Sequence, residues 1–523
     1  MSAIPRDIPT MLSRWVATAP DATALEARSG TMTYRQLDAA VSCAAGAMYG
    51  RGVRPGDRVA ACLPNDLAIV VAFYGAMRLG AVWVGIGSAL AAPEKARLIA
   101  HSDPRIMLTT ADVTTTLTTD QDVAAMGLEI LTVGACGATA EWEQMLEAGL
   151  DAPPVEISAH APAGIAYTSG TTASPKGVVH SQHNLLMPGA VVVSERSYGP
   201  ALRKGDCLPL TILNVMALSA LLTAQAGGCC VVMDRRDVTG VVTWIRESRV
   251  TVWNGVPTQL SDLVRDNAIT RGDLETLDEV WCGGAGCRDD LRDEFTAKFG
   301  QHVRATYGLT EVPTIAAMDP VGRPSALGSS GRALPHLSVT VRDDHGEDVP
   351  ADAVGELCIA AADSGPWANQ WTPMLGWWQD GDVQPAPPGP LRTGDLGTID
   401  DAGWVRVVDR IKLLIVRGGA NVYPSEVESV LLEHPSVAGA AVFGIEDDRF
   451  GERVAALVEI RAGTAEPTGE DLAELCAIAL AHYKIPEVWG FVPTLPRNAM
   501  GKVVRRDLAD MLSRAASSKE VRV

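Results

Sequence analysis

The feature that most constrains this chain is a run of small polar residues that directly follows an apolar segment. Residues 163–167, Ala-Gly-Ile-Ala-Tyr, predict a buried strand, and residues 168–177, Thr-Ser-Gly-Thr-Thr-Ala-Ser-Pro-Lys-Gly, predict a polar loop after it. Such a loop lets backbone N–H groups and hydroxyls approach phosphate oxygens, and its lysine adds a positive charge. An ordinary Ser/Thr/Gly turn is the alternative. The residues expected at the phosphates are Thr168, Ser169, Gly170, Thr171, Thr172 and Lys176.

Length and charge narrow the class of protein. A chain of 523 residues is too long for one hydrophobic core, so two or more domains are expected. With 44 basic and 63 acidic residues, the formal net charge is −19. This balance argues against general nucleic-acid binding and against adhesion to an anionic membrane. An anionic substrate remains compatible with it, because a local basic site can form in an acidic protein.

The cysteines and the apolar segments predict a cytoplasmic protein without a transmembrane segment. The ten cysteines are scattered without metal-site spacing, so free thiols in a reducing cytosol are expected. The N-terminus has no apolar core of a signal peptide. Residues 207–233 carry no charge but contain Pro209 and the pair Gly227-Gly228. They therefore predict a strand end, a buried helix and a return strand rather than a membrane span.

Hydrophobic periodicity predicts an α/β layer in the first part of the chain. Residues 1–160 alternate helical and strand patterns. The alternation resumes after the polar loop through three predicted strands, at 229–233, 250–253 and 280–282. Short strands and turns over residues 333–359 predict a small β subdomain, and residues 363–391, rich in Trp, Pro and Gly, predict an irregular connection.

A second domain is expected to begin near residue 410. Ser425 and Glu428 have the spacing of a capping box, which predicts a helix that ends at about Glu433. The other predicted elements are strands at 413–416, 437–443 and 453–460 and a helix at 468–482. The C-terminal residues therefore predict a compact α+β unit.

The polar loop resembles the phosphate loop of the adenylate-forming superfamily, which includes acyl- and aryl-CoA ligases, luciferases and peptide-synthetase adenylation domains. Residues 307–311, Tyr-Gly-Leu-Thr-Glu, match the Tyr-Gly-x-Thr-Glu motif of that family. By this resemblance Tyr307 packs on adenine, Thr310 contacts the phosphates and Glu311 holds Mg²⁺. The residue types suit these roles, because a flat ring offers stacking area and a hard cation prefers carboxylate and phosphate oxygens.

Two further segments extend the resemblance around the nucleotide. Residues 392–397, Arg-Thr-Gly-Asp-Leu-Gly, match the segment in which the family's aspartate accepts hydrogen bonds from both ribose hydroxyls, which gives this role to Asp395. Arg410 matches the arginine that also contacts the ribose. Residues 282–286, Cys-Gly-Gly-Ala-Gly, resemble the loop that borders adenine and the acyl pocket. The residues implied there are Gly283, Gly284 and Ala285.

The C-terminal motifs imply a mobile domain. Lys412 aligns with the family's hinge residue, about which this domain rotates between two half-reactions. Residues 418–424, Gly-Gly-Ala-Asn-Val-Tyr-Pro, resemble the loop that lines the pantetheine tunnel, which implies a CoA-binding role for Gly418 and Gly419. Residues 495–502 resemble the motif Leu-Pro-x-x-x-x-Gly-Lys, whose lysine, here Lys502, reaches the nascent acyl-adenylate.

The architecture implied by the resemblance is an α/β fold with two domains. Residues 1–409 would form a large N-terminal domain of layered α/β subdomains with a small β subdomain, and residues 410–523 a mobile α+β lid domain. In the acyl pocket the chain departs from the family's Pro-Leu/Met-Phe-His-x-x-Gly, because residues 209–215 read Pro-Leu-Thr-Ile-Leu-Asn-Val. Ile212, Asn214 and Val215, with Gly283, are the expected pocket residues.

The implied activity is carboxylate activation by ATP and Mg²⁺ to an acyl-AMP, followed by transfer to CoA. An amine or a carrier-protein thiol is the alternative acceptor. A nucleotide-binding regulator without turnover is disfavoured, because Lys176, Glu311, Asp395 and Lys502 are all intact. The expected partners are a small carboxylic acid, ATP and CoA or an amine, with no nucleic acid, in a monomer or homodimer. No charged side chain lies in residues 210–218, so we expect an uncharged monocarboxylic acid.

Overall fold

The computed structural model describes residues 4–118, 123, 126–134, 139–168, 176–284, 286–498 and 501–518. Of the predicted site residues, Ser169, Gly170, Thr171, Thr172 and Ala285 lie outside this part. The chain forms two compact units. The first comprises residues 1–338 and 360–391, and the second comprises residues 339–359 and 392–523. The predicted domain boundary at 409/410 stays a prediction.

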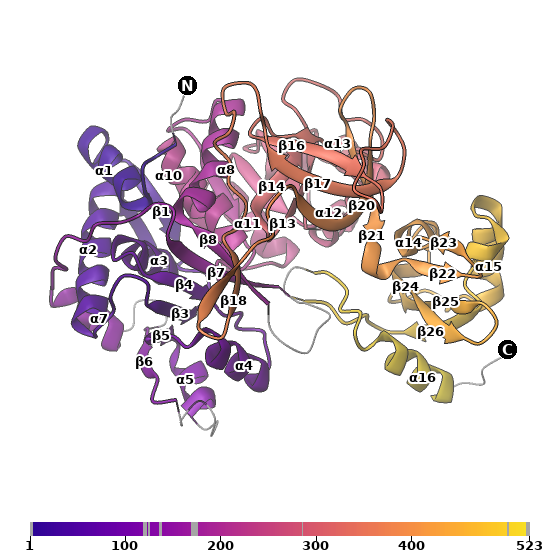
Figure 1. Ribbon diagram of the computed structural model, residues 1–523, viewed down its shortest axis with the longest axis horizontal. Coiled ribbons are helices and arrows are strands. Elements are labelled where there is room, and N and C mark those ends of the chain that lie inside the picture. Colours follow the sequence, from indigo (N-terminus) through magenta and orange to yellow (C-terminus); the bar gives the residue numbers. More distant parts are fainter. Residues whose placement is uncertain are drawn as a thin grey trace. The chain divides into compact units, whose positions relative to one another are not determined.

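The first unit is built on two large sheets (Figure 1). In spatial order, the first sheet contains β15 (Arg332–Ala333), β14 (Val312–Met318), β13 (Val303–Leu309), β12 (Glu279–Cys282), β11 (Val252–Gly255), β9 (Arg203–Asp206), β10 (Cys229–Val232), β1 (Thr23–Ala27) and β2 (Gly30–Thr33). Its inner strands, from β13 to β1, are parallel, and the outer pairs are antiparallel. The predicted strands at 229–233, 250–253 and 280–282 are confirmed here.

The second sheet carries the strand before the polar loop. Its spatial order is β19 (Asp382–Pro385), β18 (Gly376–Gln379), β8 (Lys176–Ser181), β7 (Pro162–Thr168), β4 (Val82–Gly85), β3 (Arg58–Cys62), β5 (Ile106–Thr109) and β6 (Glu129–Thr132). Strands β7 to β6 run parallel, while β8 returns antiparallel beside β7. The parallel core explains the nearly continuous apolar sequence of these strands, since both faces are covered.

Helices cover both sheets. They are α1 (Ile8–Thr18), α2 (Tyr34–Gly50), α3 (Leu67–Arg78), α4 (Ala92–Ser102), α5 (Ala111–Thr118), α7 (Glu141–Glu147), α8 (Gln182–Glu195), α9 (Leu213–Met216), α10 (Leu222–Ala226), α11 (Val238–Glu247), α12 (Pro257–Arg265) and α13 (Asp289–Phe299). A π-helical turn, η1 (Ala217–Leu221), joins α9 to α10. The uncharged residues 207–233 thus form a buried helical segment and the return strand β10, as predicted.

The second unit contains two smaller sheets. One has the order β16 (Leu337–Arg342), β17 (Gly355–Ala361), β20 (Leu391–Ile399) and β21 (Val405–Arg410). The other has the order β23 (Ala420–Val422), β22 (Ile415–Arg417), β25 (Gly451–Ile460) and β24 (Val437–Asp447), with β26 (Val488–Val492) paired to β25. Helices α14 (Pro424–Leu431), α15 (Gly469–Ala479) and α16 (Leu508–Ser518) pack beside this sheet (Figure 1).

The structure corrects two local predictions. Residues 363–391 are not wholly irregular, because β18 and β19 form a hairpin that extends the second sheet. Its Trp378 is 7% exposed and packs into that core. The capping box at Ser425 is also wrong. Helix α14 begins with Pro424 as its first residue, and the carboxylate of Asp409 accepts a hydrogen bond from the Ser425 amide at 2.8 Å.

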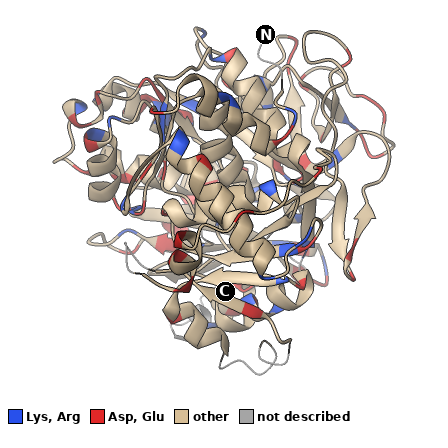
Figure 2. Cartoon of the chain, turned by 90° about the vertical axis from the view of Figure 1, so that its left-hand side faces the viewer, with Lys and Arg blue, Asp and Glu red and all other residues tan. Residues whose placement is uncertain are grey.

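The charged surface residues, the cysteines and the hydropathy of the helices bear on the compositional predictions. In Figure 2 basic and acidic residues are interspersed along the helices that face the viewer. The nine cysteines within the described residues are free thiols. Among the helices that the structure describes, none combines the length and the hydropathy that crossing a membrane requires.

Candidate active site

The predicted phosphate loop connects two paired strands. Thr168 is the last residue of β7 and is the register partner of Lys176, the first residue of β8. Lys176 is exposed, whereas Gly177–Ser181 are buried. The buried strand before the loop is confirmed, whereas Thr168 and Lys176, both predicted as loop residues, lie on the paired strands β7 and β8. The loop residues themselves lie outside the described part.

Thr310 and Glu311 form the two-residue turn of a hairpin. Leu309, the last residue of β13, pairs with Val312, the first residue of β14. Tyr307 lies on β13 and is 8% exposed, while Thr310 and Glu311 are partly exposed at the turn. One short hairpin thus carries the three side chains that are expected at adenine, phosphate and metal.

A buried histidine ties this turn to the phosphate-loop hairpin. The Nε2 atom of His180 on β8 lies 2.8 Å from the carbonyl oxygen of Thr310. His180 has no exposed surface. Burial lowers the pKa of its imidazole to about 4, so the ring is neutral near pH 7. A neutral ring facing a carbonyl oxygen must carry its proton on Nε2 and donate it to Thr310.

The glycine loop after β12 approaches the same hairpin. A Cβ atom at Gly283 would lie only 2.3 Å from Oγ1 of Thr306, the residue before Tyr307, so the close approach requires glycine. Gly284 has a φ of +80° and is exposed. The loop is thus placed beside the predicted adenine-binding strand.

The short helix α9 lies between the two functional hairpins. It contacts β7 and β14, and the Nδ2 atom of Asn214 donates to the carbonyl oxygen of Leu309 at 3.4 Å. Val215 is buried, and Ile212 caps the N-terminus of α9 without a side-chain hydrogen bond. Asn214 Oδ1 is sealed from solvent and has no hydrogen-bond partner among the described residues. Asn214 is therefore placed to hold the hairpin turn.

In the second unit, Asp395 and Arg410 face each other across paired strands. They are register partners on β20 and β21, and Arg410 Nε lies 2.9 Å from Asp395 Oδ1. The Asp395 side chain is 5% exposed and that of Arg410 is 58% exposed. A buried carboxylate held by a guanidinium is a pre-oriented acceptor for hydroxyl groups.

Lys502 lies close to this pair. The pKa of its ammonium is lowered, first by loss of hydration and then by the charge of Arg410, while Asp395 raises it. Its backbone exchanges two hydrogen bonds with Asn498, at 2.8 and 3.0 Å. Protein atoms surround the ammonium although part of the residue stays accessible to solvent, which screens some of the charge interaction. The second unit therefore brings together the three residues expected at the ribose and the acyl-adenylate.

The predicted hinge lies in a short turn between two sheets. Lys412 is exposed in a 3₁₀ turn, η3 (Ile411–Leu413). Just before it, Asp409 is 8% exposed and accepts from the Ser425 amide. Ser425 Oγ also donates to the carbonyl oxygen of Val408 at 2.5 Å. The chain on either side of Lys412 is thus linked by two hydrogen bonds.

Gly418 and Gly419 form the turn between β22 and β23. Their φ angles are +59° and +83°, and the flanking pair is Arg417 with Ala420. This is the backbone that a two-residue type I′ hairpin requires, and it explains why both residues are glycine. The amide of Gly418 donates to the Phe450 carbonyl at 2.7 Å, which fixes the turn.

The described residues fit a metal ion that is bound partly by nucleotide phosphates. They do not form a site in which protein side chains alone would surround the ion. Among them there is no cluster of three or more His, Cys, Asp or Glu side chains that could hold an ion. Glu311, partly exposed at its turn, offers one carboxylate. Mg²⁺ is commonly held by one or two carboxylates, substrate phosphates and water, so this donor set fits it.

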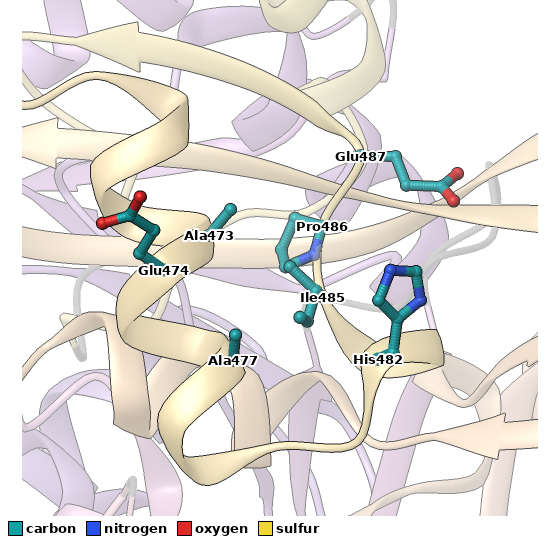
Figure 3. A pocket seen from close by; sticks show the side chains of 7 residues that line it. All are labelled: Ala473, Glu474, Ala477, His482, Ile485, Pro486 and Glu487. Carbon is teal, nitrogen blue, oxygen red and sulfur yellow. The ribbon is translucent and has the colours of Figure 1, made fainter.

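A separate hollow of about 360 Å³ lies between α15 and the following turn (Figure 3). Ala473 and Ala477 line it from the helix, and His482, Ile485 and Pro486 from the other side. None of the sequence-predicted site residues lines it. It is therefore not part of the candidate active site.

Sequence reasoning missed two residues that hold the site. His180 comes four residues after Lys176 on one strand, so both side chains lie on the same face. This spacing from the predicted phosphate lysine could have indicated that His180 faces the same side of the sheet as Lys176. Asp409, which caps α14, precedes Arg410 directly, but its partner Ser425 is distant in sequence and gave no signal.

Comparison with known proteins covers both units. Residues 12–364 match the family model of the AMP-binding enzyme, and residues 426–502 match that of the AMP-binding enzyme C-terminal domain. A long-chain-fatty-acid–CoA ligase of Mycobacterium tuberculosis is 32% identical over 498 residues, which covers 92% of this chain and 93% of that protein. A fatty acid–[acyl-carrier-protein] ligase of Streptomyces coeruleorubidus is 30% identical over 502 residues, covering 94% and 93%.

A solved structure agrees with this assignment. ATP-bound MatB from Rhodopseudomonas palustris has a TM-score of 0.86 and 26% identity, covering 98% of this chain and 100% of that chain. Because the larger family model spans more than half of the sequence and the similarity continues over nearly its whole length, the chain belongs to the AMP-binding enzyme family and is an AMP-forming acid–CoA ligase, which uses ATP to make an acyl-adenylate and then a CoA thioester.

Proposed function

We propose that this ligase activates an uncharged monocarboxylic acid of medium size, with Asp395, Arg410 and Lys502 holding the adenylate. The observation that carries the placement of the adenylate is the buried Asp395 carboxylate, held 2.9 Å from Arg410 with Lys502 nearby. An acceptor of two hydroxyl hydrogen bonds beside two cations suits a ribose and the acyl phosphate next to it.

In the first half-reaction, a carboxylate oxygen attacks the α-phosphorus of ATP. A bond forms between that oxygen and phosphorus, and the bond to the bridging oxygen of pyrophosphate breaks. Lys502 and Lys176 stabilise charge on the phosphate oxygens, and Thr310 positions them. Mg²⁺, bound through Glu311 and the phosphates, would supply further charge neutralisation. The work of the protein is mainly positioning and electrostatics.

In the second half-reaction, a thiol attacks the acyl carbon and AMP leaves. We propose that the C-terminal domain rotates about Lys412 between the two steps, so that Lys502 withdraws and the Gly418-Gly419 turn approaches the acceptor. The type I′ turn supports this role, because it presents backbone without side-chain bulk.

The acid is proposed from the residues around α9. The buried side chains of α8, α9 and η1 are uncharged. A second carboxylate would be buried without a cationic partner, at a cost of several kcal/mol. Acetate would leave apolar surface unfilled and lose about 0.8 kcal/mol per missing methylene. We therefore expect a medium-chain acyl, alicyclic or aryl acid.

Comparison of kcat/KM for hexanoate, benzoate, cyclohexanecarboxylate, acetate and malonate tests the proposal, with acid-dependent pyrophosphate release and the acyl-CoA mass as readouts. The first three acids should exceed acetate and malonate by tenfold or more, about 1.4 kcal/mol. If malonate or acetate were the best substrate, the assignment of an uncharged, medium-sized pocket would be wrong.

A carrier-protein thiol is the second candidate acceptor. It is favoured by the 30% identity to a ligase that is named for transfer of a fatty acid to acyl-carrier protein. Both acceptors present a phosphopantetheine thiol, so one tunnel could serve either. Parallel reactions with CoA and with a phosphopantetheinylated carrier protein distinguish them, with acylated carrier protein detected by intact mass.

A further inference from the structure

The turn that carries Thr310 and Glu311 is not fixed by its own hairpin. The favoured two-residue hairpin turns need a positive φ at one or both central residues. Neither Thr310 nor Glu311 has one, in contrast to Gly418 and Gly419. Leu309 also pairs with both Val312 and Pro313, which is a bulge. Such a turn does not follow the twist of its strands, so a contact from outside must set its position.

The backbone beside the turn is strained. Thr314 has a φ of +104° although it is not glycine, and it is 5% exposed. Strain of this kind persists only where surrounding contacts hold it. A Cβ atom at Gly308 would lie 1.6 Å from the carbonyl oxygen of Thr314, so the two strands approach unusually closely. The hairpin is therefore irregular directly behind its two functional residues.

His180 supplies an outside contact. Its Nε2–H donates to the Thr310 carbonyl at 2.8 Å, and its side chain is wholly buried. The bond runs between strands of two different sheets, β8 and the β13–β14 hairpin. His180 also shares one face of β8 with Lys176. The same strand thus holds the phosphate lysine and the residue that reaches the opposite turn.

We propose that His180 is a positioning residue that fixes the Thr310–Glu311 turn at the Mg·ATP site. It touches neither nucleotide nor metal itself. It holds the backbone between the phosphate hydroxyl and the carboxylate, and so helps to set the distance from Lys176 to Glu311. Asn214, which donates to the Leu309 carbonyl at 3.4 Å, supports the same turn. This inference goes beyond the roles proposed above and rests on the assignment of Glu311 to the metal.

The test compares Mg²⁺-dependent ATP binding in substitutions at this position. His180→Leu removes the donor, His180→Asn shortens its reach, and His180→Gln keeps an N–H near the position of Nε2. Val178→Ala is the matched control, because Val178 is 1% exposed on the same face of β8. Calorimetry measures ATP affinity for each purified protein with Mg²⁺ and with EDTA, after circular dichroism has confirmed folding.

We expect His180→Leu and His180→Asn to lose about three- to tenfold of the affinity that Mg²⁺ adds, the range of one hydrogen bond. His180→Gln should recover most of it, and Val178→Ala should retain it. The adenylation kcat should follow the same order, because a small displacement of a positioning group is costly. Imidazole ¹⁵N spectra of the wild type should show His180 protonated on Nε2.

Two results would overturn the inference. One is that Mg²⁺ raises the ATP affinity of His180→Leu as much as that of the wild type. The other is that all four variants lose this gain in affinity equally, which would indicate an effect of packing alone. Failure of the proposed acid specificity is separable, because ATP and Mg²⁺ binding is measured without any acid.

Discussion

At the scale of single residues, the charge of Lys502 should serve only the first half-reaction. Lys502 lies beside Asp395 and Arg410, where the adenylate is expected. We predict that Lys502→Ala lowers the rate of adenylation by 10²-fold or more, since a well-placed electrostatic group contributes about 3 kcal/mol. Thioester formation from supplied acyl-AMP should remain largely intact.

Single-turnover assays of each half-reaction would measure this difference. Arg506→Ala is the control, because Arg506 is an exposed cation four residues away. An equal loss in both half-reactions for Lys502→Ala would show that the lysine does not withdraw after the first step.

At the scale of elements, the 3₁₀ turn Ile411–Leu413 is expected to be the hinge. Proline fixes φ and restricts the residue before it, so Lys412→Pro should hold the turn near one state. We predict that adenylation survives and that thioester formation falls at least tenfold. Rotation must also break the hydrogen bonds from Ser425 to Asp409 and Val408, which lie across the hinge.

The matched control is Lys412→Ala, which removes the same side chain without fixing φ. Half-reaction rates and the accumulation of enzyme-bound acyl-AMP would be measured for both variants. Unaltered overall turnover in Lys412→Pro would place the hinge elsewhere.

At the scale of the whole molecule, buried histidine makes stability sensitive to acid. His336 is fully buried, neither ring nitrogen has a hydrogen-bond partner within the described residues, and burial lowers its pKa to about 3. In the unfolded chain the same histidine binds a proton near pH 6.5. The free energy of unfolding linked to the neutral His336 is therefore at its maximum above pH 6.5 and falls as the pH is lowered toward 3.

We predict that His336→Phe reduces the loss of unfolding free energy between pH 7.5 and pH 5 by about 2 kcal/mol. Urea unfolding of the wild type and the variant at both pH values, followed by tryptophan fluorescence, would measure it. A variant with the same pH dependence as the wild type would mean that other groups govern acid sensitivity.

The sequence by itself determined the α/β class, the buried strand before the polar loop, and the motif at residues 307–311 that places Thr310 beside Glu311. These features follow from local periodicity and from residue types that act within a few positions. The Gly418-Gly419 turn was equally local, because a two-residue turn with positive φ selects glycine.

Only the tertiary structure decided which distant residues support those motifs. His180 meets Thr310 across 130 positions, and Asp409 rather than a capping box caps α14. The Trp-rich residues around β18 became a sheet edge, because Trp378 finds a core that no local pattern reveals. Contacts between segments far apart in sequence depend on how sheets and helices pack, and single-sequence periodicity carries no information about that packing.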